Sequence, residues 1–122
     1  MKVMLLAYEA PEDFALRENK AKYDEYLKAW MTFGQSMRDA GVYVDSAALH
    51  DRGSATVVTV RNGKRSVEDG PYSDTKEQLG GFCIIDVADL KTATQWAVKC
   101  PAAKRGYVDV RPVPYLDGGP IT

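Results

Sequence analysis

The stretch from Asp69 to Phe82 reads DGPYSDTKEQLGGF, and the rest of the chain is organised around it. Gly70 permits a positive φ, while Pro71 fixes its own φ and removes a backbone donor, so neither a helix nor a central strand can continue through this loop. The two glycines near its end precede the apolar run Phe82–Ile85, which predicts a buried strand. A polar loop set on a buried strand is a usual location for function, although the same composition also fits an ordinary connection.

Outward from this loop, hydrophobic periodicity and turn residues divide the chain into strands and helices. Apolar residues at spacings of three and four predict a long amphipathic helix that Gly41 ends. Asn62-Gly63 favours the tight turn of a hairpin, and Asp89 and Pro101 mark the start and end of a second helix. The predicted strands are Val3–Tyr8, Val42–Leu49, Ala55–Arg61, Lys64–Glu68, Phe82–Val87 and Tyr107–Val113; the predicted helices are Glu18–Ala40 and Asp89–Lys99, with a loop at Glu9–Asp13.

The order of these elements predicts an α+β, ferredoxin-like split βαβ fold, with a mainly antiparallel sheet and both helices on one face. We expect one domain over residues 1–115 and a loose tail over 116–122, where two glycines and a proline occur. The continuous apolar strands Val3–Tyr8 and Phe82–Val87 would leave the second face of the sheet apolar. Because an exposed patch of that size indicates association, we predict a homodimer of the dimeric α/β-barrel type, in which the two uncovered faces meet.

The charge balance argues against two classes of partner. The chain has 16 Lys and Arg against 17 Asp and Glu, interleaved along its length, so neither nucleic acid nor a membrane is expected as a partner. The opening apolar run is too short for a signal-peptide core, which favours a cytoplasmic protein. Cys83 and Cys100 are not spaced like a disulfide framework, and with a single histidine they do not form a structural zinc site; a carboxylate metal site stays open.

Several of these segments together resemble the DGPF proteins, a branch of the YCII-related domain family. The resembling residues are Met4-Leu5-Leu6, Asp69-Gly70-Pro71, Thr75-Lys76-Glu77, Gly80-Gly81-Phe82, Trp96-Ala97, Cys100–Ala103, Gly106 and Val108–Val113. They span nearly the whole chain, although Tyr72 stands where phenylalanine is usual and Asp109 where glutamate is usual. The resemblance implies a dimeric ferredoxin-like fold. It implies less about activity, because most members are uncharacterised.

For some YCII-type relatives the resemblance implies a catalytic histidine–aspartate pair, with the histidine early in the first helix. This chain has no histidine there, and its only one, His50, follows the second strand beside Asp51. Neighbours along a strand point to opposite faces, so these two do not make a pair. Because histidine changes charge near neutral pH, His50 stays a catalytic candidate against the simpler reading as a surface residue. Asp69 is the better catalytic candidate by resemblance, or else a turn former that caps nearby N–H groups.

The remaining candidates surround the loop and the last strand. Glu77 could shuttle a proton and Lys76 could bind a ligand, or the two could form a structural ion pair. Alternation along the last strand turns Asp109 and Arg111 to one face, where Arg111 could hold a carboxylate through two hydrogen bonds. The two side chains could equally neutralise each other. Tyr8, at the end of a central strand, completes the predicted ligand-binding set.

These residues predict a small-molecule-binding homodimer, which as an enzyme would perform acid–base chemistry on a small organic acid or carbonyl compound without a cofactor. The predicted pocket lies beside the Asp-Gly-Pro loop, where Asp69, Lys76, Glu77 and Arg111 would converge. The alternative is a non-catalytic accessory or regulatory protein, because members of the family are often associated with alternative sigma factors. The missing helix histidine favours this alternative, while the titratable residues around the loop favour chemistry.

Overall fold

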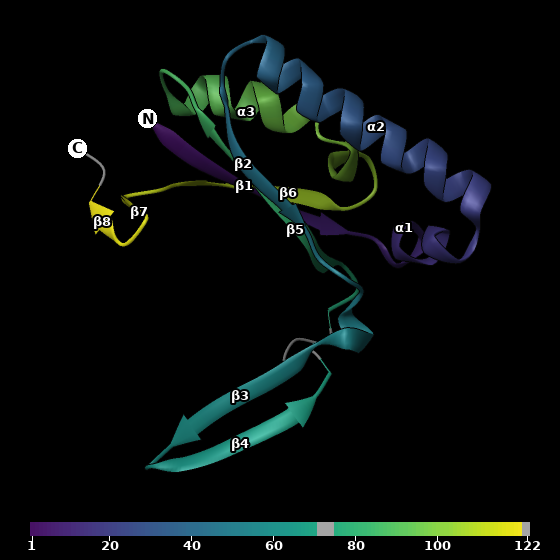
Figure 1. Ribbon diagram of the computed structural model, residues 1–122, viewed down its shortest axis with the longest axis vertical. Helices are drawn as coiled ribbons and strands as arrows, with labels where there is room; N and C mark the ends of the chain where they lie inside the picture. The colour runs from purple at the N-terminus through teal and green to yellow at the C-terminus, as the bar shows by residue number, and fades with distance from the viewer. Residues whose placement is uncertain (71–74, 121–122) are drawn as a thin grey trace.

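A four-stranded antiparallel sheet carries the helices on one face in the computed structural model, which describes residues 1–70 and 75–120 (Figure 1). The main elements are β1 (Lys2–Glu9), α1 (Pro11–Ala15), η1 (Leu16–Glu18), α2 (Lys20–Asp39), β2 (Tyr43–Ala48), β5 (Gln78–Asp86), α3 (Leu90–Val98), η3 (Pro101–Lys104) and β6 (Tyr107–Pro112). The strands lie in the order β2-β5-β1-β6, and every neighbouring pair is antiparallel. The predicted α+β, ferredoxin-like fold is therefore confirmed.

The core forms between the sheet and the two longer helices because β1 alternates along its length. Val3, Leu5 and Ala7 are buried, and the residues between them are only partly buried. From the helices, α2 contributes Phe33 and Met37, whereas α3 contributes the small residues Ala93 and Ala97. A glutamate, Glu9, occupies the next inward position of β1, so the alternation that builds the core also carries a carboxyl group to its edge.

The helix ends follow the capping residues of the sequence, with one correction. Asp89 caps α3 by accepting a hydrogen bond from the Thr92 amide at 2.8 Å, and Gly41 has a φ of +74° directly after α2. The segment after β1, expected as a loop at Glu9–Asp13, instead contains α1 and η1. Pro11 suits the first turn of a helix, because the amide it lacks would have no partner there.

The predicted hairpin forms a separate two-stranded sheet that projects away from the main sheet (Figure 1). Its strands are β3 (Thr56–Arg61) and β4 (Lys64–Asp69), with positive φ at Asn62 and Gly63 in the turn between them. A 3₁₀ turn, η2 (Arg52–Ser54), precedes it.

Residues 71–74 of the Asp-Gly-Pro loop, Tyr72 among them, lie outside the described residues. A two-residue pairing of β7 (Tyr115–Leu116) with β8 (Gly119–Pro120) follows β6, and a domain limit at residue 115 stays a prediction.

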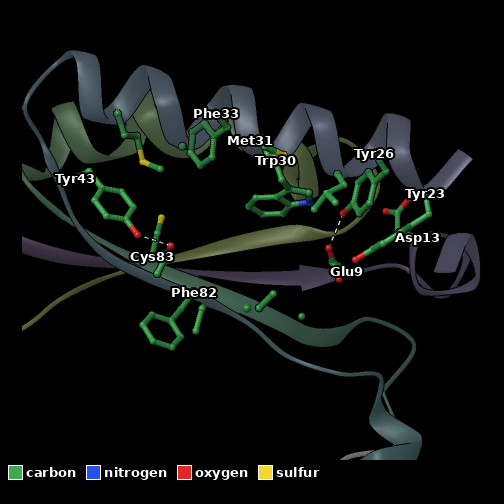
Figure 2. A pocket seen from close by; sticks show the side chains of 18 of the residues that line it. Glu9, Asp13, Tyr23, Tyr26, Trp30, Met31, Phe33, Tyr43, Phe82 and Cys83 are labelled. Atoms are coloured by element: carbon green, nitrogen blue, oxygen red, sulfur yellow. Dashed lines mark hydrogen bonds between the residues drawn. The ribbon is translucent and has the colours of Figure 1, made fainter. Parts of the chain in front are cut away.

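The face of the main sheet that points away from the helices is here called the open face. Along β1 it carries Met4, Leu6 and Tyr8, the residues that alternate with the core positions. Register places Leu6 between Phe82 of β5 and Asp109 of β6. Figure 2 shows the Phe82 side chain on the side of the sheet away from α2. The alternation predicted for the last strand is confirmed, since its valines, Val108 and Val110, pack against the core.

Candidate functional site

A cavity of about 270 Å³ lies between α2 and the strands β2 and β5, on the helix side of the sheet (Figure 2). Most of its wall is aromatic or apolar, and the side chains that supply this character are Tyr23, Tyr26, Trp30, Met31, Phe33 and Tyr43. The polar groups gather where β1 ends and α1 begins. Ligand pockets in proteins range from roughly 300 to 1,000 Å³. This cavity therefore suits a small compound.

Glu9 is the buried carboxyl group of this cavity. Its relative exposure is 6%, and its Oε1 accepts a hydrogen bond of 2.6 Å from the Tyr26 hydroxyl. Burial raises the pKa of the Glu9 carboxyl, and the Asp13 carboxylate adds to the rise, while the hydrogen bond from Tyr26 and the charge of Arg17 act in the opposite direction. The result is a carboxylic acid that holds its proton to higher pH than an exposed glutamate does.

The glycines that precede Phe82 create the space for this carboxyl group. A Cβ on Gly80 would lie 2.6 Å from Cδ of Glu9, too close for any side chain. A Cβ on Gly81 would lie 2.6 Å from the carbonyl oxygen of Ala47 on β2. The backbone at this glycine pair is thus closely approached from both sides, by Glu9 and by the edge strand.

A second carboxylate in the cavity wall is neutralised by an ion pair. Asp13 of α1 is 2% exposed, and its Oδ1 accepts a hydrogen bond from the Arg105 guanidinium, which lies just after η3. The Asp13 carboxylate raises the pKa of Arg105, first through this hydrogen bond and then through its charge. Glu9 and Asp13 thus differ in chemistry: one is bonded to a neutral hydroxyl, and the other to a permanent cation.

The aromatic wall holds Tyr26 in place. Its ring meets Trp30 edge-on, with centroids 6.3 Å apart, and Trp30 meets Phe33 in the same manner at 6.1 Å. Burial, followed by the hydrogen bond to Glu9, raises the pKa of the Tyr26 hydroxyl. Tyr26 therefore stays neutral and remains a hydrogen-bond donor toward Glu9.

Two arginines order the polar parts of the wall. The Arg17 guanidinium donates to the carbonyl oxygen of Leu49 at 2.7 Å, which ties η1 to the residue after β2. The guanidinium of Arg38 lies 4.3 Å from the ring centroid of Tyr43. The Tyr43 hydroxyl in turn shares a 2.6 Å hydrogen bond with the Ser46 hydroxyl. These contacts connect α2 and η1 to the edge strand around the cavity.

The seven residues chosen from the sequence do not line this cavity. His50 is exposed just after β2, and Lys76 is exposed just before β5. Asp69 pairs with Thr56 in the projecting hairpin, whereas Arg111 lies opposite Met4 on the edge strand of the main sheet. The structure therefore places Asp69 and Arg111 in different sheets. Their functional roles stay predictions.

The other chosen residues lie on or beside the open face. Tyr8 stacks on Tyr107 with ring centroids 4.6 Å apart and an interplanar angle of 12°. Desolvation raises the pKa of Tyr107, and the charges of Tyr8, Asp109 and Glu77 act in the same direction. Tyr8 and Tyr107 are therefore in contact, Asp109 follows two residues along β6, and Glu77 lies just before β5.

Sequence reasoning missed the polar residues Glu9, Asp13 and Tyr26 at one end of the cavity, and Arg105, which pairs with Asp13. A signal for Glu9 was present, because it continues the alternation of Val3, Leu5 and Ala7 and is therefore a carboxyl group in phase with the core. For Asp13 and Arg105 the sequence carries no comparable signal, since they are 92 residues apart.

Neither thiol is a reactive thiolate, and the described residues form no metal-binding cluster. Cys83 contributes to the cavity wall, but burial raises the pKa of its thiol to about 12, so it is not a thiolate at neutral pH. Among residues 1–70 and 75–120, no group of three or more His, Cys, Asp and Glu side chains could hold a metal ion. In the same part of the chain, no helix is long and apolar enough to cross a membrane.

The split βαβ topology and the buried carboxyl group define an α+β protein with a small cavity beside its sheet. The family model of the YCII-related domain matches residues 1–116, and the chain belongs to that family. The resemblance deduced from the sequence is thereby confirmed, and the DGPF assignment is consistent with it.

Two known proteins are similar to this chain. An uncharacterized protein of Rhizobium meliloti (strain 1021) is 34% identical over 85 residues, which is 68% of each chain. Among solved structures, 5-chloro-2-hydroxyhydroquinone dehydrochlorinase from Burkholderia phenoliruptrix AC1100, in complex with 2,5-dihydroxybenzoquinone, matches with a TM-score of 0.52 and 11% identity over 93% of each chain. At that identity the second likeness shows the fold alone.

Proposed function

We propose that the protein binds a small, largely apolar carbonyl or hydroxyl compound in the cavity between α2 and the β2–β5 edge, with Glu9 as the proton donor and acceptor. The observation that carries this proposal is the buried carboxyl group of Glu9, whose pKa is raised by burial and which lies in the wall of a cavity. A carboxyl group in such an environment can exchange a proton with a ligand near neutral pH.

The wall chemistry indicates which ligand fits. Aromatic faces favour a flat or compact apolar body. At the polar end protonated Glu9 offers one donor, and the Tyr26 oxygen, whose hydrogen is bonded to Glu9, offers an acceptor. Glu9 must be ionised to take a proton, and in that form its negative charge would repel an anionic group at this end. Of the two ligand classes expected from the sequence, the carbonyl compound is therefore favoured over the organic acid.

The reaction best supported is proton transfer at a carbon next to a carbonyl group. Ionised Glu9 would take the proton, and the electrons of the C–H bond would move toward the carbonyl oxygen. The Tyr26 hydroxyl, which donates to Glu9 in the structure, would have to turn its single hydrogen from Glu9 to that oxygen to stabilise the developing charge. Return of the proton from Glu9 restores the enzyme, so no cofactor is needed. The related fold of an enzyme bound to an oxygenated ring compound is in keeping with this class of ligand.

The test separates binding from chemistry. In a Trp96→Phe background Trp30 is the remaining tryptophan, so its fluorescence reports the cavity during titration with small uncharged quinones and cyclic diketones. Exchange of the C–H protons of the same diketones for deuterium, followed by NMR, reports proton transfer. We expect binding and exchange in the parent protein and binding without exchange in Glu9→Gln. Failure of every compound to change Trp30 fluorescence would overturn the proposal.

The alternative function is that of a non-catalytic accessory or regulatory protein. One observation favours it: the only histidine, His50, is exposed and outside the cavity wall, so the pair used by some relatives is missing. Binding with no exchange in the parent protein would support this alternative. A link to an alternative sigma factor and a cytoplasmic location stay predictions from the sequence.

We further propose that two copies associate through their open faces. Support comes from the apolar side chains of the two central strands there, where Leu6 lies beside Phe82 and Met4 beside Ile84. Helices cover the other face of the same sheet, so a second sheet would complete the core on this side. The cavity lies on the helix side, and each copy would keep its own.

A further inference from the structure

A second hollow, of about 940 Å³, lies on the other flank of α2 and is here called the cationic groove. It runs between α2 and the segment Lys99–Arg105, which contains η3. Tyr26 and Phe33 belong to the walls of both hollows, so these two rings form the ridge between the cavity and the groove. The groove shares no other residue with the cavity, and the proposed function makes no use of it.

The charge of the groove departs strongly from that of the whole chain. Five basic side chains line it, together with a single carboxylate, that of Glu25; the basic residues are Lys22, Lys28, Lys99, Lys104 and Arg105. The chain as a whole has a net charge of −1. Such a local excess of positive charge attracts anions, and more strongly at low ionic strength.

Most of this positive charge is not neutralised within the described part of the chain. Arg105 is committed to Asp13, but over residues 1–70 and 75–120 no carboxylate lies within ion-pair distance of any of the four groove lysines. Lys99 is held with its ammonium 4.6 Å from the ring centroid of Trp96, a contact that positions the charge without cancelling it. Within the described residues the groove therefore presents four lysines that form no ion pair.

The floor between these cations is apolar. It is built from the partly buried side chains of Leu16, Tyr26 and Pro101 and from the buried ring of Phe33. An apolar floor with a cationic rim is complementary to a molecule that has an apolar body and an anionic group. A simple inorganic anion would leave the floor exposed, and an uncharged apolar molecule would leave the lysines without a partner.

We infer that the cationic groove is a second binding site, for a small organic anion such as an aromatic carboxylate. The apolar body would lie against Tyr26, Phe33 and Pro101, and the carboxylate would lie between Lys28 and Lys104. The two sites of the protein then differ in ligand chemistry: the cavity receives an uncharged, largely apolar carbonyl or hydroxyl compound, and the groove receives an anion.

The experiment is a titration of isotope-labelled protein with naphthoate, followed through amide chemical shifts, in parallel with uncharged naphthol. We expect naphthoate to shift the amides of Ala29, Thr32 and Ala103, and to bind at least about tenfold more tightly than naphthol at low salt, with the difference shrinking as salt is added. Absence of naphthoate binding, or shifts confined to cavity residues such as Gly80 and Gly81, would overturn the inference.

A charge-reversed variant and a matched control complete the test. Lys28→Glu combined with Lys104→Glu should weaken naphthoate binding by at least about tenfold, because the rim side chains then repel the carboxylate of naphthoate instead of attracting it. Lys20→Glu combined with Lys64→Glu changes the net charge equally but touches no groove residue, and its affinity should stay within about twofold of the parent. The milder pair Lys28→Gln and Lys104→Gln should give an intermediate loss if the reversed variant folds poorly. Equal affinity of groove and control variants would contradict the site.

Discussion

The carboxyl group of Glu9 lies against the backbone of Gly80, in the space that a side chain at position 80 would need. The contact is made across neighbouring strands at the point where the β1–β5 register shifts. It explains why a glycine occupies a strand interior, where glycine otherwise costs stability. It also fixes the carboxyl group in the wall of the cavity, where the Tyr26 hydroxyl can reach it.

Gly80→Ala should therefore destabilise the fold and disturb the cavity. The new Cβ would lie 2.6 Å from Cδ of Glu9 and force the carboxyl group to move, at a cost of about 1–3 kcal/mol, typical of overpacking. Chemical denaturation measures the change. Gly34→Ala on α2 is the control, since a Cβ there meets the Arg38 guanidinium at an ordinary 3.4 Å. If Gly80→Ala lowers the free energy of unfolding by the same amount in a Glu9→Ala background, the contact with the Glu9 carboxyl group is not the cause of the loss.

The stability of the protein should depend on pH through Glu9. Its pKa is raised above the ordinary value of 4.5 by burial, so the folded state binds this proton more tightly than the unfolded chain does. The contribution to the free energy of unfolding is then greatest below pH 4.5 and falls as the pH rises through the raised pKa. Urea midpoints of the parent and Glu9→Gln, measured from about pH 4 to about pH 8, should show the parent losing stability relative to the variant. A difference that does not change with pH would refute the assignment.

Tyr26→Phe should lower stability by about 1–3 kcal/mol, because a buried carboxyl group loses its hydrogen-bond donor. The same bond lowers the pKa of Glu9, so its removal should extend the pH-dependent loss of stability to higher pH. Tyr23→Phe is the matched control, since Tyr23 lines the same cavity without bonding Glu9. Equal effects of the two substitutions would show that the Tyr26 hydroxyl has no special role.

Gly70→Ala tests the backbone of the Asp-Gly-Pro loop. Gly70 has a φ of +93°, a conformation that side chains disfavour even though a Cβ there would meet no atom within 4 Å. We expect a loss of about 1 kcal/mol, visible as a lower thermal midpoint. Gly119→Ala, which also meets open space and has no positive φ, should leave the midpoint unchanged. An unchanged thermal midpoint in Gly70→Ala would show that the positive φ at this position does not contribute to stability.

Leu6→Asp tests the proposed association of open faces. The substitution places a carboxylate between Phe82 and Asp109 at the centre of that face, and in a dimer it would be buried without a partner. We expect light scattering at micromolar concentration to report dimers for the parent and monomers for the variant. Val98→Asp, at a side chain 73% exposed on α3, should remain dimeric. A monomeric parent protein would contradict the proposed association through the open faces.

The sequence by itself determined the architecture, because local sequence patterns specify the strands, turns and helix ends. The alternation of Val108 and Val110, the Asn62-Gly63 turn and the Asp89 cap each depend on neighbours only a few residues away. The segment containing Pro11 was the exception, where a proline taken as a loop residue instead begins a helix.

The candidate site was decided by tertiary structure. Tyr26 meets Glu9 across 17 residues and Arg105 meets Asp13 across 92, and no local pattern links either pair. The position of Gly80 against Glu9 depends in the same way on which strands pair and in which register. The titratable residues of the Asp-Gly-Pro loop are conspicuous in the sequence, yet the cavity forms on the helix side of the sheet, because enclosure requires two packed layers.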